Sequence, residues 1–361
     1  MIQIFTRRGY FACIKLGAQG YPVNKAYTYA CHLGDILNGT LLPPHRRILV
    51  NGFWRSGTTW LQETLERMLQ ARSVFEPFNY HGAAAYNSHR EFSIKRCLPE
   101  FAPPRYDYRF ANLFMPYAPE SLTAFPQTQR VIDMALRGQL VMRMYGDRRK
   151  SLRDCLTLTV VTKFTRASLC LNAIAQSFGV PIIHVCRDPR AVIASIQTLD
   201  GGHFAEDSFN QLSLVDQLLK VKDGRYRYFR QWQSDIEAID QLSAVGRIAA
   251  YFCLTERFLE ETIRFDHHRN RIMIRYEDLV ISHGKAFGEV ITALGFRTQG
   301  DRCDADLPST TDWNNVCHDR RTTQERLLSW QKKLSPYDQG LIEEITQTFN
   351  MTHRLWRGVA E

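Results

Sequence analysis

Residues 48–60 read ILVNGFWRSGTTW, an apolar run followed by a glycine-containing loop and the first turn of a helix. Four apolar residues then fall on one helical face, Leu61, Leu65, Met68 and Leu69. A strand, a loop and a helix in this order form a cradle for an anion, because backbone N–H groups and the positive end of the helix dipole converge there. The stretch therefore predicts a phosphate-binding loop at the end of a buried strand.

The two glycines of this loop, Gly52 and Gly57, have the spacing of the nucleotide-triphosphate loop G-x-x-x-x-G-K-[ST]. Thr58 stands where that loop has its lysine, and the basic residue lies inside the loop, at Arg55. This exchange argues against ATP chemistry with Mg²⁺. A P-loop kinase or NTPase is still one alternative, and a plain strand-to-helix turn with a threonine cap is another.

A second strand, loop and helix follow further along the chain. Residues 180–186 read as a buried strand, and Arg187-Asp188-Pro189-Arg190 reads as a turn that leads into a helix carrying Ser195. Arg187 can form paired, charge-assisted bonds to a phosphate, and Ser195 adds a hydroxyl donor. The alternative is that Arg187 pairs with Asp188 and that Ser195 only faces a helix neighbour.

Both units, in this order, resemble the sulfotransferases that use 3′-phosphoadenosine 5′-phosphosulfate (PAPS). In that family (K/R)-S-G-T-T-W holds the 5′-phosphosulfate, and R-D-P-R-x-x-x-x-S holds the 3′-phosphate. The resemblance covers roughly residues 46–350. It implies an α/β fold of the P-loop type, in which a central parallel sheet lies between two layers of helices. It also implies transfer of a sulfuryl group from PAPS to an acceptor hydroxyl, with 3′-phosphoadenosine 5′-phosphate (PAP) as the product.

The resemblance also assigns roles to individual residues. The first loop would bind the donor through Trp54, Arg55, Ser56, Gly57, Thr58, Thr59 and Trp60. Arg187 and Ser195 would hold the 3′-phosphate, and a late segment would add Arg321. Lys163 follows a β-branched run, where related enzymes place a basic residue close to the sulfonate. Arg55 and Lys163 are the expected catalytic cations, and no metal is implied.

The wording of two motifs favours a carbohydrate acceptor. W-R-S-G at residues 54–57 and F-E-P at residues 75–77 resemble the carbohydrate sulfotransferases that modify the 6-hydroxyl of Gal or GlcNAc. R-S-G-T-T also resembles the tyrosylprotein sulfotransferases. In both groups a Glu follows the loop arginine at a similar distance, which makes Glu76 the expected base, with His81 and His89 as substitutes. A tyrosine, phenol or small alcohol acceptor stays open, as does a non-catalytic protein that binds PAP or a glycan.

Composition and charge are consistent with an enzyme for an anionic donor. The 361 residues carry a net charge of +9, and no basic run with interleaved aromatic residues indicates nucleic acid as a partner. The nine cysteines show no C-x-x-C spacing, which favours reduced thiols over a zinc site or a disulfide framework. No run of about eighteen apolar residues predicts a membrane span. We therefore expect a soluble, cytoplasmic, bacterial enzyme, with a trimmed form of a Golgi-anchored enzyme as the alternative.

The rest of the chain is expected to form one domain with additions. Residues 1–45 read as an N-terminal extension, and residues 46–361 as a single sulfotransferase-like domain. Acceptor-side insertions are expected near 78–150 and 201–247, where polar and aromatic residues interrupt the pattern. Residues 271–279 resemble the family's Y-E-D-L strand, whose acidic pair we interpret as structural.

Overall fold

The computed structural model describes residues 46–78, 100–101, 110, 113–139, 158–198, 209–263, 265, 270–282, 285–296 and 322–357. The extension expected over residues 1–45 lies outside these residues, as do the predicted site residues Arg321, His81 and His89.

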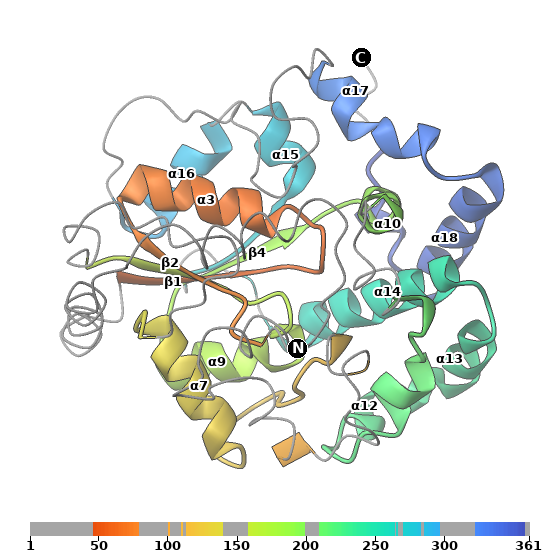
Figure 1. Cartoon of the computed structure of the whole chain (residues 1–361), viewed down its shortest axis with the longest axis horizontal. Coiled ribbons are helices and arrows are strands. Elements are labelled where there is room, and N and C mark those ends of the chain that lie inside the picture. Colours follow the sequence, from red (N-terminus) through yellow and green to blue (C-terminus); the bar gives the residue numbers. More distant parts are fainter. Residues whose placement is uncertain are drawn as a thin grey trace, which may run out of the picture.

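A parallel sheet of five strands forms the centre of the described fold (Figure 1). Its strands are β1 (Arg47–Asn51), β2 (Arg72–Phe75), β3 (Val160–Lys163), β4 (Ile182–Cys186) and β5 (Arg271–Arg275). They lie in the order β2-β3-β1-β4-β5, and every pairing is parallel. Strands β1, β3 and β4 are buried at every position, as expected where helices cover both faces of a parallel sheet. All five carboxyl ends therefore meet at one edge.

Two helical layers cover the sheet, which confirms the predicted three-layer α/β fold. One layer contains α3 (Thr58–Leu69), α15 (Tyr276–Ile281) and α16 (Lys285–Ala293), and the other contains α7 (Pro126–Leu136), α9 (Leu171–Phe178) and α14 (Ala244–Thr262) (Figure 1). Successive side chains of β1 point to opposite faces of the sheet. Ile48 and Val50 lie in the core with α3 and α16, while Leu49 lies in the core with α7 and α9.

The remaining elements lie beside these layers. Helix α10 (Pro189–Gln197) follows β4, and α12 (Tyr226–Phe229) and α13 (Gln233–Asp240) lie in the predicted insertion near 201–247. The C-terminal segment forms α17 (Thr323–Leu327) and α18 (Pro336–Thr348), of which α18 packs against α14. Short 3₁₀ turns occur at Ser168–Cys170, Arg230–Trp232, Ser329–Lys332 and Thr352–Arg354, and a π-helical turn occurs at Val215–Leu219.

The prediction of a strand over residues 271–279 was wrong in its second half. The strand ends at Arg275, and the chain continues as the helix α15 from Tyr276. Glu277 and Asp278 occupy the first turn of this helix, where negative charges are favourable near the positive end of the helix dipole. The turn into the helix directs the Tyr276 ring against Gly57.

Candidate functional site

The first loop adopts a conformation that only its glycines permit. A Cβ atom at Gly52 would lie 2.5 Å from the carbonyl oxygen of Val185, and one at Gly57 would lie 2.3 Å from the Tyr276 ring. Gly57 also has a φ of 90° and is the N-cap of α3. The loop backbone therefore passes close to β4 and α15 before it enters the helix, which leaves the N-terminus of α3 facing the edge where the strands end.

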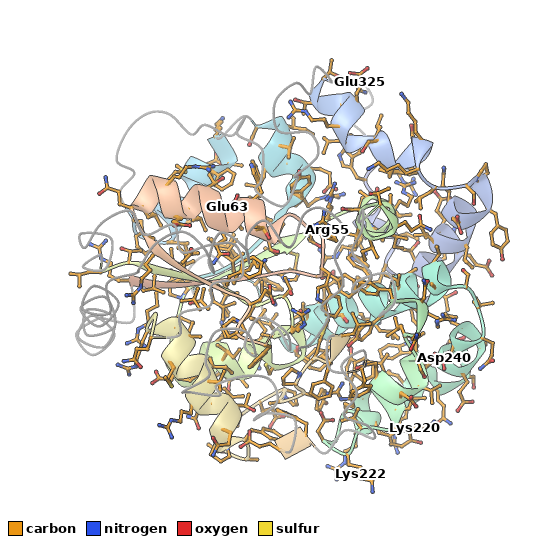
Figure 2. The ribbon with its side chains drawn as sticks, in the orientation of Figure 1. Arg55, Glu63, Lys220, Lys222, Asp240 and Glu325 are labelled. Carbon is orange, nitrogen blue, oxygen red and sulfur yellow. The ribbon has the colours of Figure 1, made fainter. Side chains whose placement is uncertain are left out.

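The two units that the sequence singled out meet at this edge. Arg55 Nε donates a hydrogen bond of 2.9 Å to Ser195 Oγ on α10, and Arg187 Nη1 donates one of 2.9 Å to the carbonyl oxygen of Arg55. Figure 2 shows Arg55 between α3 and α10. The Arg187 guanidinium also lies over the Tyr276 ring, 4.3 Å from its centroid. Two guanidinium groups, a serine hydroxyl and a helix N-terminus thus gather in one place, an arrangement suited to phosphate groups.

The Asp188 carboxylate forms its hydrogen bonds with Arg190 and Trp356 rather than with its neighbour Arg187. It accepts hydrogen bonds from the backbone and side chain of Arg190 and from the backbone N–H of Trp356. The backbone N–H of Asp188 donates to Glu277 Oε1 at 3.0 Å. Burial raises the pKa of the Glu277 carboxyl. Both acidic residues therefore hold the backbone of the turn, and Arg187 is left to face the loop.

A third basic residue, Lys163, ends β3 beside the loop. Its ammonium group donates a hydrogen bond of 2.8 Å to Thr59 Oγ1 and lies 3.5 Å from Glu76 Oε1. It also lies over the Phe75 ring, 3.6 Å from the centroid. Burial lowers the pKa of Lys163 to about 8, although the Glu76 carboxylate acts in the opposite direction. Lys163 thus connects the first turn of α3 to the end of β2.

Glu76 lies just after β2 in a strained backbone conformation, with a φ of 46°. Its carboxylate accepts hydrogen bonds from the backbone N–H of Thr165 at 3.0 Å and from Arg166 Nη1 at 3.1 Å. Only 3% of the residue is exposed. The end of β2 and the segment after β3 therefore place one carboxylate between two buried cations, Lys163 and Arg166.

The two tryptophans of the loop face different parts of the molecule. Trp60 packs edge-on against Tyr276 and Phe287, in the core under α3 and α16. Trp54 packs against Phe209 and Tyr251, at the boundary of the core that contains α13 and α14. Both are predicted to contact the donor, and their rings pack with different cores.

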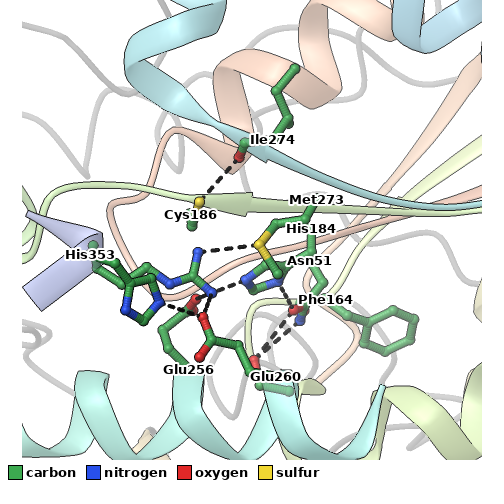
Figure 3. A network of polar contacts seen from close by, with 11 residues as sticks. Asn51, Phe164, His184, Cys186, Glu256, Glu260, Met273, Ile274 and His353 are labelled. Carbon is green, nitrogen blue, oxygen red and sulfur yellow. Dashed lines mark hydrogen bonds and ion pairs between the residues drawn. The ribbon is translucent and has the colours of Figure 1, made fainter. Parts of the chain in front are cut away.

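A buried network holds the base of the loop, and no motif in the sequence pointed to it (Figure 3). Asn51, the last residue of β1, donates through Nδ2 to the carbonyl oxygen of Phe164 at 2.6 Å, so its Oδ1 is the atom 2.8 Å from His184 Nδ1. His184 Nε2 lies 3.0 Å from Glu256 Oε2, and Arg354 pairs with the same carboxylate. Both ring nitrogens of His184 therefore lie within hydrogen-bonding distance of an oxygen atom, which fixes the ring between β1 and α14.

Four buried polar atoms near the loop have no hydrogen-bond partner within the described part of the chain: Ser56 Oγ, Arg187 Nε, Trp54 Nε1 and Thr165 Oγ1. An unpaired buried donor costs free energy, so such groups in a native fold require an explanation. Ser56 and Arg187 lie beside Arg55, where an anionic ligand would pair them. The sequence did not single out Thr165 or Tyr276 as site residues. Thr165 lies just after β3, which ends at the predicted cation Lys163, and Tyr276 directly follows β5.

The described residues contain neither a membrane-spanning helix nor a cluster of metal-binding side chains. No helix among them combines the length and apolar character needed to cross a membrane. No three of their His, Cys, Asp or Glu side chains lie close enough together to hold a metal ion.

Comparison with known protein families gives a match to one family. A family model described as "Sulfotransferase family" matches residues 47–300.

Solved structures similar to this chain include a sulfotransferase domain from the curacin biosynthetic pathway, with 16% identity and a TM-score of 0.39 over 84% of this chain and 97% of that one. A mouse sulfotransferase, SULT7A1 complexed with PAP, has 14% identity and a TM-score of 0.39, with 90% of each chain covered. Retinol dehydratase in a complex with retinol and PAP has 12% identity and a TM-score of 0.37, over 88% of this chain and 85% of that one. No curated protein matches the chain significantly.

Proposed function

The chain belongs to the sulfotransferase family, and we propose that it transfers a sulfuryl group from PAPS to a hydroxyl group of a carbohydrate. The observation that supports PAPS as the donor most directly is the hydrogen bond between Arg55 and Ser195, which are 140 residues apart in the sequence. It joins the loop before α3 to the helix after β4. PAPS carries a phosphosulfate at the 5′ position of its ribose and a phosphate at the 3′ position. Two adjoining phosphate sites therefore suit PAPS better than a single triphosphate loop does.

We assign donor binding to the residues at these two sites. The backbone N–H groups at the start of α3 and the hydroxyls of Ser56, Thr58 and Thr59 would hold the 5′-phosphosulfate. Arg187 and Ser195 would hold the 3′-phosphate, and the unpaired Nε of Arg187 would then gain a partner. Arg321, which lies outside the described residues, stays a predicted contact to the same nucleotide.

Arg55 and Lys163 would stabilise the charge that develops during transfer. As the acceptor oxygen bonds to sulfur, the bond from sulfur to the bridging oxygen breaks and its electron pair stays on the phosphate of PAP. A fixed cation beside that oxygen lowers the barrier, because its charge is already in place when the negative charge grows. Lys163 is suited to this role because Thr59 holds its ammonium group at the start of α3.

Glu76 would accept the proton that the acceptor hydroxyl loses. Its carboxylate lies next to Lys163, so the proton acceptor and the cation that faces the donor are neighbours. The strained backbone at Glu76 fits a residue that is held for function rather than for stability alone. The carbohydrate acceptor rests on the resemblance of residues 54–57 and 75–77 to carbohydrate sulfotransferases.

Calorimetric titration tests the donor. PAP and, separately, ATP with Mg²⁺ are titrated into the wild type, Arg187→Ala and Arg227→Ala, the last a matched control because Arg227 is exposed on α12. We expect micromolar PAP binding that weakens more than about tenfold in Arg187→Ala and stays unchanged in Arg227→Ala, with weaker ATP binding throughout. Absence of PAP binding, or a preference for ATP with Mg²⁺, would overturn the proposal.

A further inference from the structure

Two of the four unpaired polar atoms have no role in the proposed phosphate sites. Trp54 Nε1 and Thr165 Oγ1 are buried and have no hydrogen-bond partner among the residues that the structure describes. Trp54 comes from the loop after β1, and Thr165 comes from the segment after β3. Neighbouring strands of a parallel sheet thus bring both to the edge at which ligands bind.

Arg166 links these two residues to the carboxylate of Glu76. Its guanidinium lies over the Trp54 ring, 5.6 Å from the centroid, and donates to Glu76 Oε2 at 3.1 Å. The backbone N–H of Thr165 donates to the other carboxylate oxygen at 3.0 Å. The indole N–H, the threonine hydroxyl and the proposed base therefore belong to one cluster.

Lys163 connects this cluster to the first turn of α3. Lys163 bonds to Thr59 in the first turn of α3 and faces Glu76 with the same ammonium group. Trp54 packs against Phe209, the first described residue of the predicted insertion near 201–247, and its side chain is only partly buried. An acceptor that approaches along the exposed part of Trp54 would lie beside the cluster that contains Glu76.

We propose that Trp54 Nε1 and Thr165 Oγ1 bind the acceptor and select one that carries a second oxygen beside the reacting hydroxyl. This inference rests on the proposed function. An indole N–H can only donate, and an oxygen beside the hydroxyl whose proton passes to Glu76 would accept its hydrogen bond, whereas the threonine hydroxyl can donate or accept. A sugar has such a second oxygen in its ring or in a neighbouring hydroxyl, and a simple phenol has none. Trp54 is then a specificity-determining residue on the acceptor side rather than a donor contact.

Steady-state kinetics of four variants tests this assignment. Trp54→Phe and Thr165→Val remove the polar atoms and keep most of the shape, and Thr165→Ser restores the hydroxyl. Trp330→Phe is the matched control, because Trp330 Nε1 is also buried and without a partner in the described chain but its ring packs under Arg190. The probes are N-acetylglucosamine, galactose and chondroitin, with p-nitrophenol as the acceptor that has no adjacent oxygen, and PAP binding is measured in parallel.

We expect Trp54→Phe and Thr165→Val to raise the sugar KM by about tenfold, with unchanged PAP affinity and an unchanged KM for p-nitrophenol. Thr165→Ser and Trp330→Phe should behave like the wild type. An unchanged sugar KM, a parallel loss of PAP affinity in Trp54→Phe, or turnover of p-nitrophenol alone would overturn the inference. Failure of the proposed function is distinct from these results, because the wild type would then bind no PAP.

Discussion

Lys163 Nζ donates a hydrogen bond of 2.8 Å to Thr59 Oγ1, which ties the cation at the end of β3 to the first turn of α3. The same ammonium group lies 3.5 Å from Glu76 Oε1. One buried side chain therefore touches both the residues proposed to hold the donor and the residue proposed to receive the acceptor's proton. Its charge is positioned before any ligand binds, as electrostatic stabilisation of a transition state requires.

The protonation of Lys163 should limit catalysis at alkaline pH. Burial lowers its pKa to about 8, so the free enzyme loses this charge as the pH rises through about 8. We expect kcat/KM for PAPS to fall over that range, since a neutral amine cannot offset the charge on the bridging oxygen. A pH profile of kcat/KM measures this. In Lys163→Arg the alkaline decline should disappear, because a guanidinium stays charged, even though the rate at neutral pH is lower. A decline that persists in Lys163→Arg would assign it to another group.

Replacement of Glu76 by Gln should lower kcat by about 10²–10⁴-fold, because an amide cannot accept the acceptor's proton. PAP affinity should be nearly unchanged, since the carboxylate does not contact the phosphate-binding loop directly. Arg166 loses its buried ion pair with Glu76 in this variant, so we also expect a loss of about 3–5 kcal/mol in the free energy of unfolding.

Urea denaturation and calorimetric PAP titration identify conditions in which the Glu76→Gln variant is folded, and turnover is then measured there. Near-full turnover in the folded variant would remove Glu76 from the role of base. It would leave Glu76 as the residue that positions Lys163 and Arg166.

Gly57→Ala should abolish donor binding for two reasons that act together. The residue has a φ of 90°, and its Cβ would lie 2.3 Å from the Tyr276 ring, so the loop must move away from α15. Gly179→Ala is the control, because Gly179 has a φ of 58° but a Cβ placed there would meet no atom within 4 Å. Gly179→Ala should lose about 1–2 kcal/mol in the free energy of unfolding, because alanine disfavours the left-handed backbone conformation, and it should bind PAP normally. Equal PAP affinity in both variants would show that the close approach of Tyr276 does not shape the loop.

Much of the fold and part of the site could be predicted because local pattern and chemistry coincide there. The spacing of Gly52 and Gly57 and the apolar run before them predicted β1, its loop and α3, and the meeting of Arg55 with Ser195 follows from the shared edge of parallel strands. Arg187 was predicted to face the same site, and it bonds to the Arg55 carbonyl. The roles of these residues in binding PAPS are still predictions.

Other parts of the site depend on tertiary contacts that no local pattern records. His184 stands inside an apolar strand and Glu256 inside a mostly apolar helix, and each is unusual alone, but their pairing joins segments 72 residues apart. The same holds for Thr165, whose unpaired hydroxyl becomes apparent only when its neighbours are placed. The end of β5 at Arg275 was missed because Tyr276 and Leu279 continue an apolar pattern that also suits a strand.

The network under the loop should make the fold sensitive to acid. Burial alone would raise the pKa of the Glu256 carboxyl, but the positive charges of His184 and Arg354 outweigh burial and hold that pKa below its usual range. A carboxyl whose pKa is lower in the folded state stabilises the fold above its unfolded pKa, and this stabilisation is lost as the pH falls through the folded value. We therefore expect the free energy of unfolding to fall steeply below about pH 4.5.

Glu256→Gln tests this prediction, because it removes the negative charge that His184 and Arg354 contact in the buried network. At neutral pH the variant should lose about 3–5 kcal/mol of stability in urea denaturation. Below about pH 4.5 the wild type should approach the variant, since protonation removes the same charge. Glu260→Gln is the control, because Glu260 also pairs with Arg354 but is partly exposed, and it should cost less. A constant difference between wild type and Glu256→Gln down to the acid transition would assign the acid sensitivity to other carboxylates.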